Sequence, residues 1–127
     1  SVYATFGYLQ TILEEQGYHT AMVAGVPSFC AVAARLNRSL TGGMDTPLTI
    51  APGSIPLEDL LSTPGAKVLM KSGRQLPRVL DTLSDAGLLE KSALVCNCGL
   101  PEEQVWDDLA HDRPEGNAGY FATILVK

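Results

Sequence analysis

The stretch Val23-Ala-Gly-Val-Pro-Ser-Phe-Cys-Ala-Val-Ala-Ala-Arg-Leu36 decides the fold, because it passes from an apolar run through a turn into a helical pattern. Gly25 gives the backbone the freedom that a tight turn needs. Ser28 is placed to accept a hydrogen bond from a free N–H of the first helical turn. The alanines that follow allow the helix to approach a sheet closely. The stretch therefore predicts a tight connection from a strand to a helix.

Helical and strand patterns alternate on both sides of this stretch. Apolar residues at helical spacing, with Gly or Pro at the ends, predict helices, and short apolar runs bounded by turn residues predict strands. The predicted helices are 4–16, 28–37, 56–62, 75–86 and 101–109, and the predicted strands are 18–24, 48–53, 67–71, 92–98 and 120–126. This alternation predicts an α/β, three-layer domain with a mixed five-stranded sheet and helices on both faces.

Composition excludes several classes of function. The 127 residues are 46% hydrophobic and 18% charged, which suits one compact domain or a piece of a longer protein. The net charge is −5, and no dense Lys/Arg cluster is present, so we expect no nucleic-acid partner. No apolar run is long enough to cross a bilayer, and the N-terminus lacks the pattern of a signal peptide. We therefore expect no membrane association.

The three cysteines, Cys30, Cys96 and Cys98, fit neither a disulfide framework nor a Cys-x-x-Cys zinc pair. We interpret them as reduced thiols of a cytoplasmic protein, with Cys30 in the core and no metal site. A redox or metal role for Cys96 and Cys98 is the alternative. His19 and His111 are far apart in the sequence and are interpreted as surface or hydrogen-bonded histidines. The acidic pairs at 102–103 and 107–108 are expected on the solvated face of helix 101–109.

Five short motifs are spread over nearly the whole chain. They are Tyr3-Ala-Thr-Phe-Gly-Tyr-Leu9, Ala24-Gly-Val-Pro-Ser-Phe29, Val68-Leu-Met-Lys-Ser-Gly-Arg74, Asn97-Cys-Gly-Leu-Pro-Glu-Glu103 and Gly119-Tyr-Phe-Ala-Thr-Ile-Leu-Val-Lys127. Together they resemble motifs of the C-terminal domain of the tetrapyrrole (corrin/porphyrin) methyltransferases. The Met-Lys, Asn-Cys-Gly and Tyr-Phe pieces are most similar to the enzymes that methylate C20 of precorrin-2 or cobalt-factor II.

The resemblance implies methyl transfer from S-adenosyl-L-methionine (SAM) to a tetrapyrrole in cobalamin (vitamin B12) biosynthesis, with S-adenosyl-L-homocysteine as product. It also implies a homodimer. Two alternatives stay open. One is a corrin methyltransferase that modifies a different position, and the other is a non-catalytic domain for ligand binding or dimerisation.

The sequence also departs from the family pattern. The changed positions are Ala4, Ala24, Pro27 and Ala122, which alter a turn and remove two hydroxyl groups. The N-terminal domain of the family, with its Gly-rich loop and Gly-Asp-Pro, is not in this sequence. Residues 1–17 are therefore expected to be the end of that domain or a connecting helix, and 18–127 the C-terminal methylase domain. We expect the fragment alone to be inactive.

Methyl transfer from a sulfonium requires little more than positioning of donor and acceptor and exclusion of water. The resemblance places Thr5 and Phe6 against the cofactor, with a helix cap and a core ring as the alternatives. It places Met70 and Lys71 there too, because ligands bind beyond the carboxyl ends of strands. The alternative for this pair is a core methionine followed by an exposed lysine.

Tyr120 and Phe121 follow a glycine-containing loop, 111–119, and by resemblance border the adenosine pocket. The Tyr120 hydroxyl is interpreted as a hydrogen-bond donor to the cofactor, or as a catalytic group that helps to remove the proton displaced from the methylated carbon. The alternative is an aromatic core pair.

Overall fold

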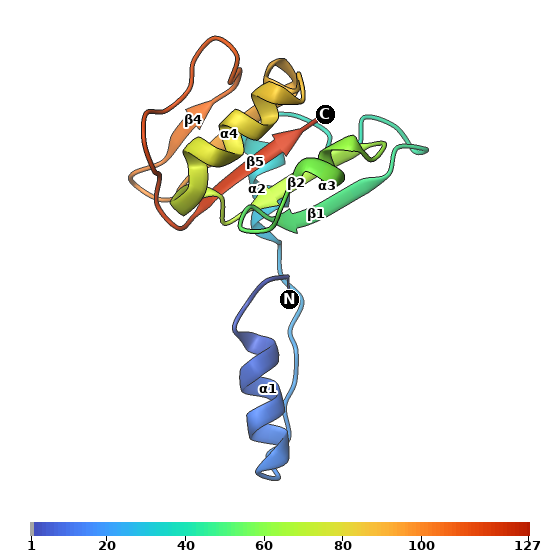
Figure 1. Cartoon of the computed structure of the whole chain (residues 1–127). Coiled ribbons are helices and arrows are strands. Elements are labelled where there is room, and N and C mark those ends of the chain that lie inside the picture. The colour runs from blue at the N-terminus through green and yellow to red at the C-terminus, as the bar shows by residue number, and fades with distance from the viewer. Residues whose placement is uncertain (1) are drawn as a thin grey trace.

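The computed structural model describes residues 2–127, and Figure 1 shows a body built on a sheet from which one helix projects. The α-helices are α1 (Phe6–Glu15), α2 (Ser28–Arg35), α3 (Glu58–Ser62) and α4 (Leu76–Asp85), and two short 3₁₀ helices are η1 (Gly73–Gln75) and η2 (Leu89–Lys91). The strands are β1 (Leu48–Pro52), β2 (Ala66–Met70), β3 (Ser92–Cys96), β4 (Gln104–Trp106) and β5 (Ala122–Val126).

The five strands form one mixed sheet in the order β1-β2-β5-β3-β4. β1 and β2 are parallel, whereas β5 is antiparallel to both of its neighbours, β2 and β3. The carboxyl ends of β1, β2 and β3 therefore lie at the same end of the sheet as the start of β5. Residues that are far apart in the sequence come together at this end of the strands.

Helices cover both faces of the sheet, as the sequence predicts (Figure 1). On one face, Phe29 and Val32 of α2 pack against Val68 and Leu125. On the other, α3 and α4 pack against the alternate residues of the same strands, such as Leu69. Every residue of β2, β3 and β5 is buried, because these three central strands are covered on both faces.

The prediction of a strand over 18–24 is wrong. This segment forms no ladder in the described residues and leaves Met22 and Val23 59% and 91% exposed. A strand needs a second strand to pair with its backbone groups. Among residues 2–127 this segment pairs with none, and it runs beside α1 (Figure 1), where the Thr20 hydroxyl donates to the carboxylate of Glu14. Helix α1 is formed as predicted but buries none of its residues, and Leu9, Ile12 and Leu13 of its apolar stripe are exposed.

Two further predictions of local structure are wrong. The helix over 101–109 is absent: a turn follows Pro101, and Gln104–Trp106 form β4, which pairs with β3. Pairing with an open edge of the sheet outweighs the acidic, Pro-initiated helical pattern. In α2 the N-cap residue is Pro27 rather than Ser28, and no side chain caps the helix. Ser28 instead lines a cavity.

Candidate functional site

The main cavity of the structure lies at the edge where β2 and β3 end and β5 begins. Cys96 pairs with Ala122 at this edge, and the backbone N–H of Asn97 donates to the carbonyl of Phe121 (2.9 Å), so the two chain segments are held side by side. The cavity has a volume of about 520 Å³. Pockets that hold small molecules or cofactors span about 300–1,000 Å³, so the cavity is large enough for a cofactor.

Five of the six predicted site residues line this cavity, namely Thr5, Met70, Lys71, Tyr120 and Phe121. Phe6, the first residue of α1, is not among the lining residues. The structure adds lining residues that the sequence did not single out: Tyr3, Ala4, Ser28, Val32, Asn97, Cys98, Leu100 and Thr123. All of these residues except Val32 lie within the five motif segments quoted above, so membership of a motif was the signal that could have found them.

Left-handed backbone is concentrated around the cavity. Among residues 2–127, the non-glycine residues with positive φ are Tyr3, Asn37, Lys71 and Asn97, with φ between 50° and 55°, and all except Asn37 line the cavity. Lys71 and Asn97 directly follow β2 and β3. These two left-handed residues turn the chain sharply where each strand ends, and both residues line the cavity at that end. Such conformations cost about 1–3 kcal/mol and cluster at functional sites.

Three side chains that follow or precede the central strands contact one another at the rim. The ammonium of Lys71 lies 5.0 Å from the ring centroid of Tyr120, and the rings of Tyr120 and Phe121 pack edge to face at 5.3 Å. Both rings remain about half exposed or more, 49% and 62%. They are therefore not the buried core pair that was the alternative interpretation, and their faces are accessible to a ligand.

The loop that precedes Tyr120 is anchored at its end. The backbone N–H of Ala118 donates to the carbonyl of Gly73 (2.9 Å). A Cβ atom built on Gly73 would lie 1.8 Å from the carbonyl oxygen of Gly119. Only glycine permits this approach, so Gly73 sets the position at which the chain enters the cavity wall.

The cavity carries little charge. Among its described lining residues only Lys71 is charged, and its ammonium forms no ion pair within residues 2–127. The Cys98 thiol is neutral at neutral pH, because burial first and the Glu103 carboxylate second raise its pKa. The walls combine apolar surface from Met70 and Phe121 with hydroxyl groups and one cation. This lining suits a ligand that has an aromatic part and an anionic group.

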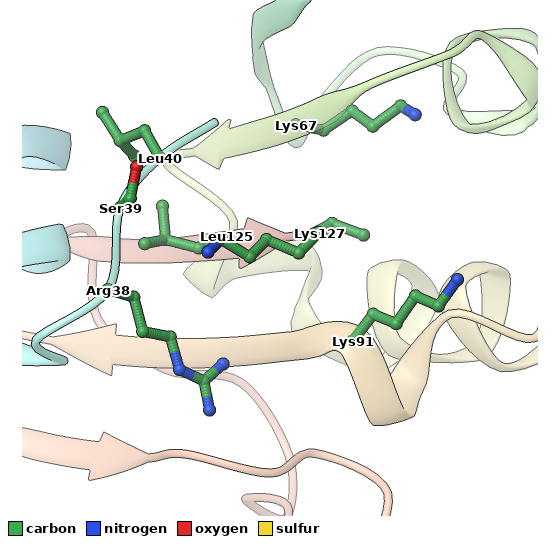
Figure 2. A pocket seen from close by; sticks show the side chains of 8 residues that line it. Arg38, Ser39, Leu40, Lys67, Lys91, Leu125 and Lys127 are labelled. Carbon is green, nitrogen blue, oxygen red and sulfur yellow. The ribbon is translucent and has the colours of Figure 1, made fainter. Parts of the chain in front are cut away.

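A second hollow lies at the opposite end of the strands, where Arg38, Lys67, Lys91 and Lys127 surround the ends of β2, β3 and β5 (Figure 2). Its volume is only about 10 Å³, close to the space needed for one water molecule. Lys67 is buried there, and its ammonium donates to the carbonyls of Thr63 and Gly65. Burial lowers the pKa of this lysine. An adjoining cavity at this end, lined by Lys67, Lys91 and Lys127 among others, has a volume of about 380 Å³, smaller than that of the main cavity.

Within the part of the chain that the structure describes, no group of three metal-ligating side chains lies together, and no helix has the length and apolar character to cross a membrane. Cys30 packs beside the core on the α2 face, and Cys96 is buried within it. His111 contacts the carboxylate of Asp108 at 2.8 Å on the surface.

Comparison with known proteins places this architecture among characterised families. The family model "Tetrapyrrole (Corrin/Porphyrin) Methylases" matches residues 1–112. The chain is 33% identical over 108 residues to the cobalt-precorrin-2 C(20)-methyltransferase of Salmonella typhimurium, a match covering 83% of this chain and 45% of that protein. It is 29% identical over 127 residues to the cobalamin biosynthesis protein CobIJ of Mycobacterium tuberculosis, covering 98% of this chain and 24% of that protein.

Solved structures share the fold. The cobalt-precorrin-4 methyltransferase CbiF superposes with a TM-score of 0.78 at 22% identity, covering 98% of this chain and 59% of that one. The uroporphyrin-III C-methyltransferase of Thermus thermophilus, complexed with S-adenosylhomocysteine, gives a TM-score of 0.66 at 20% identity, covering 98% and 60%. The chain thus spans less than half the length of the curated relatives it matches and little more than half of these structures.

Proposed function

Because this chain belongs to the tetrapyrrole (corrin/porphyrin) methylase family, we propose that it is part of a SAM-dependent methyltransferase of cobalamin biosynthesis that methylates C20 of precorrin-2 or cobalt-factor II. The C20 position is supported by the 33% identity to a cobalt-precorrin-2 C(20)-methyltransferase. The single observation that carries the proposal is the cavity at the carboxyl ends of β2 and β3, which predicted residues of three separate motifs line together.

The residues present fit the proposed cofactor. Met70 and Phe121 offer apolar surface for an adenine ring, and thioether sulfur packs favourably on aromatic faces. Thr5 and Ser28 offer hydroxyl groups, and the unpaired ammonium of Lys71 suits a carboxylate of the methionine part or of the tetrapyrrole. A solved member of the fold was crystallised with S-adenosylhomocysteine, which supports use of the same cofactor here.

When bound, SAM supplies an activated methyl group for an in-line displacement. The protein's contribution is then to orient the two reactants and exclude water. Met70 at the end of a buried strand provides a rigid wall, whereas Tyr120 and Phe121, with exposed rings, provide the side that closes over a ligand. Tyr120 stands at the rim, where its hydroxyl can donate to the cofactor or help to remove the proton displaced from the methylated carbon by passing its own proton on to water.

Replacing Tyr120 with phenylalanine separates these two roles. If the hydroxyl binds the cofactor, Tyr120→Phe weakens S-adenosylhomocysteine binding by about 0.5–1.5 kcal/mol, the net worth of one hydrogen bond. If it removes the proton, binding holds while turnover falls by about 100-fold or more. Calorimetry gives the first quantity and a methyl-transfer assay the second.

Tyr8→Phe is the matched control, because Tyr8 is 77% exposed on α1 and does not line the cavity. Unchanged binding and turnover in Tyr120→Phe would reduce Tyr120 to a packing residue.

The projecting helix α1 is proposed to belong to a different part of the enzyme from the sheet (Figure 1). Residues 1–17 form the end of an N-terminal domain or a connecting helix, and 18–127 form the C-terminal methylase domain. The exposed apolar stripe of α1 and the exposed side chains of Val23 and Val26 support this division, since both present apolar surface that a folded protein covers. We also propose that the enzyme is a homodimer and that the fragment alone is inactive.

The experiment that tests the function supplies SAM with an isotopically labelled methyl group together with precorrin-2 or cobalt-factor II. Label at C20 of the product is expected from the enzyme that contains this chain. Label at another carbon would keep the family chemistry but overturn the C20 assignment. S-adenosylhomocysteine binding without any transfer to either acceptor would favour the non-catalytic alternative.

A further inference from the structure

The turn after β3 is built around a single carboxylate that the sequence pattern assigned to a solvated helix. Asn97 and Gly99 are both left-handed, with φ of 53° and 76°, and the N–H of Leu100 closes the turn onto the carbonyl of Asn97 (2.9 Å). The side chain of Glu103 folds back under this turn, where it accepts from the backbone N–H of Gly99 at 2.8 Å. Glu103 is therefore part of the turn, not of a solvated face.

The same carboxylate has a second donor, because its other oxygen is bonded by the guanidinium of Arg35. The backbone bond from Gly99, followed by the bond from Arg35, holds the pKa of Glu103 below its usual value, so the group stays ionised at neutral pH. The Glu103 side chain is 19% exposed, against 52% for Arg35. The carboxylate is thus mostly enclosed by its partners.

These contacts join two walls of the main cavity. Arg35 is the last residue of α2, the helix that presents Ser28 and Val32 to the cavity, whereas Asn97 and Cys98 line it from the end of β3. We propose that Glu103 is a positioning residue of the cofactor site, which fixes the turn Asn97-Cys98-Gly99 against α2 so that the side chains of both elements keep one geometry around the ligand. The inference rests on the proposed function, because it names a determinant of that same site.

The electrostatics at Cys98 give this role a readout that needs no ligand. A carboxylate beside a thiol disfavours the thiolate, and Glu103 contributes in this way to the raised pKa of Cys98. Since the thiolate is the reactive form, removing the carboxylate increases the alkylation rate of Cys98. Cys96, buried in the sheet, and Cys30, which lies in α2, serve as internal references in the same sample.

The test compares Glu103→Ala, Glu103→Gln and the matched control Glu102→Gln, which changes the adjacent carboxylate. For Glu102, only its backbone carbonyl, which accepts from the Asn97 side chain, takes part in the turn. We expect Glu103→Ala to raise the Kd for S-adenosylhomocysteine about tenfold, the loss typical of hydrogen bonds to a charged group. Glu103→Gln, whose amide oxygen still accepts from Gly99, recovers part of this loss. Glu102→Gln binds as the wild type does.

Iodoacetamide alkylation followed by peptide mass spectrometry supplies the second readout in the absence of ligand. We expect faster modification of Cys98 in Glu103→Ala and Glu103→Gln only. Wild-type affinity in Glu103→Ala, or equal losses in Glu102→Gln, would overturn the positioning role. If the wild type itself binds no S-adenosylhomocysteine, the proposed function fails instead. The alkylation rates then decide alone whether Glu103 organises the turn, and unchanged rates at Cys98 would refute it.

Discussion

Replacing Gly73 with alanine is expected to displace the chain that leads into Tyr120 and to disable the site. The new Cβ would lie 1.8 Å from the carbonyl oxygen of Gly119 and 2.7 Å from that of Ala118, distances that real atoms do not adopt. Backbone on one side must move, and the hydrogen bond from the Ala118 N–H to the Gly73 carbonyl is strained or lost. Forcing atoms into a packed site costs about 1–3 kcal/mol of stability.

Two measurements check this expectation. Chemical denaturation gives the loss of unfolding free energy, and amide hydrogen exchange at Ala118 reports whether its hydrogen bond survives. Gly43→Ala is the control, because a Cβ there meets only the Thr46 hydroxyl at an ordinary 3.6 Å. Equal stability and equal ligand affinity in the Gly73 and Gly43 variants would contradict the close approach described here.

Truncating Leu69 is expected to have the largest effect on stability. Leu69 is fully buried in β2, within the core cluster under α3 and α4. Buried Leu→Ala changes cost about 2–5 kcal/mol, because they lose transfer free energy and leave a cavity. Leu69→Ala should therefore lower the denaturation midpoint sharply.

Leu9→Ala is the control for this change. Leu9 is 52% exposed on α1, which buries none of its residues, so its truncation should change stability by no more than about 0.5 kcal/mol. A cost at Leu9 equal to that at Leu69 would mean that α1 packs against the body, contrary to the structure.

The local sequence pattern was sufficient to predict a strand where the segment pairs with another strand of this chain. The runs at 67–71, 92–98 and 120–126 were predicted as strands and form β2, β3 and β5, because they pair with one another in the centre of the sheet. The run at 18–24 has the same apolar character but no neighbouring strand in the described residues. The wrong prediction for this segment shows that strand formation depends on pairing with a second strand, which the sequence of one segment cannot reveal.

The opposite error occurred at 101–109. Pro101 and the following acidic residues have the chemistry of a helix start, yet Gln104–Trp106 join the free edge of β3. Because of this error, Glu103 was interpreted as solvated, and its contacts with Gly99 and Arg35 were missed. Those contacts involve Arg35, 68 positions away in the sequence, so no local pattern could predict them.

The sequence predicted which residues line the candidate site better than it predicted their backbone conformation. The alternating pattern places Met70 and Lys71 at the carboxyl end of a strand, where ligands bind, whereas the family resemblance implied that Tyr120 and Phe121 border the pocket. The left-handed turn at Lys71, by contrast, occurs at a residue type with no preference for positive φ, whereas Asn97 is of a type often found there. Their conformation is set by the close meeting of β2, β3 and β5, and only the folded sheet shows it.

The central claim is that the cavity at the carboxyl ends of β2 and β3 binds the cofactor. Titrating S-adenosylhomocysteine into the ¹⁵N-labelled chain and following the backbone amide resonances tests it most directly. The account predicts saturable shifts concentrated at residues 70–71, 97–98 and 120–123, with the amides of Lys67 and Lys91 at the far end of the strands unaffected. Shifts confined to that far end, or no shifts at millimolar ligand, would contradict it.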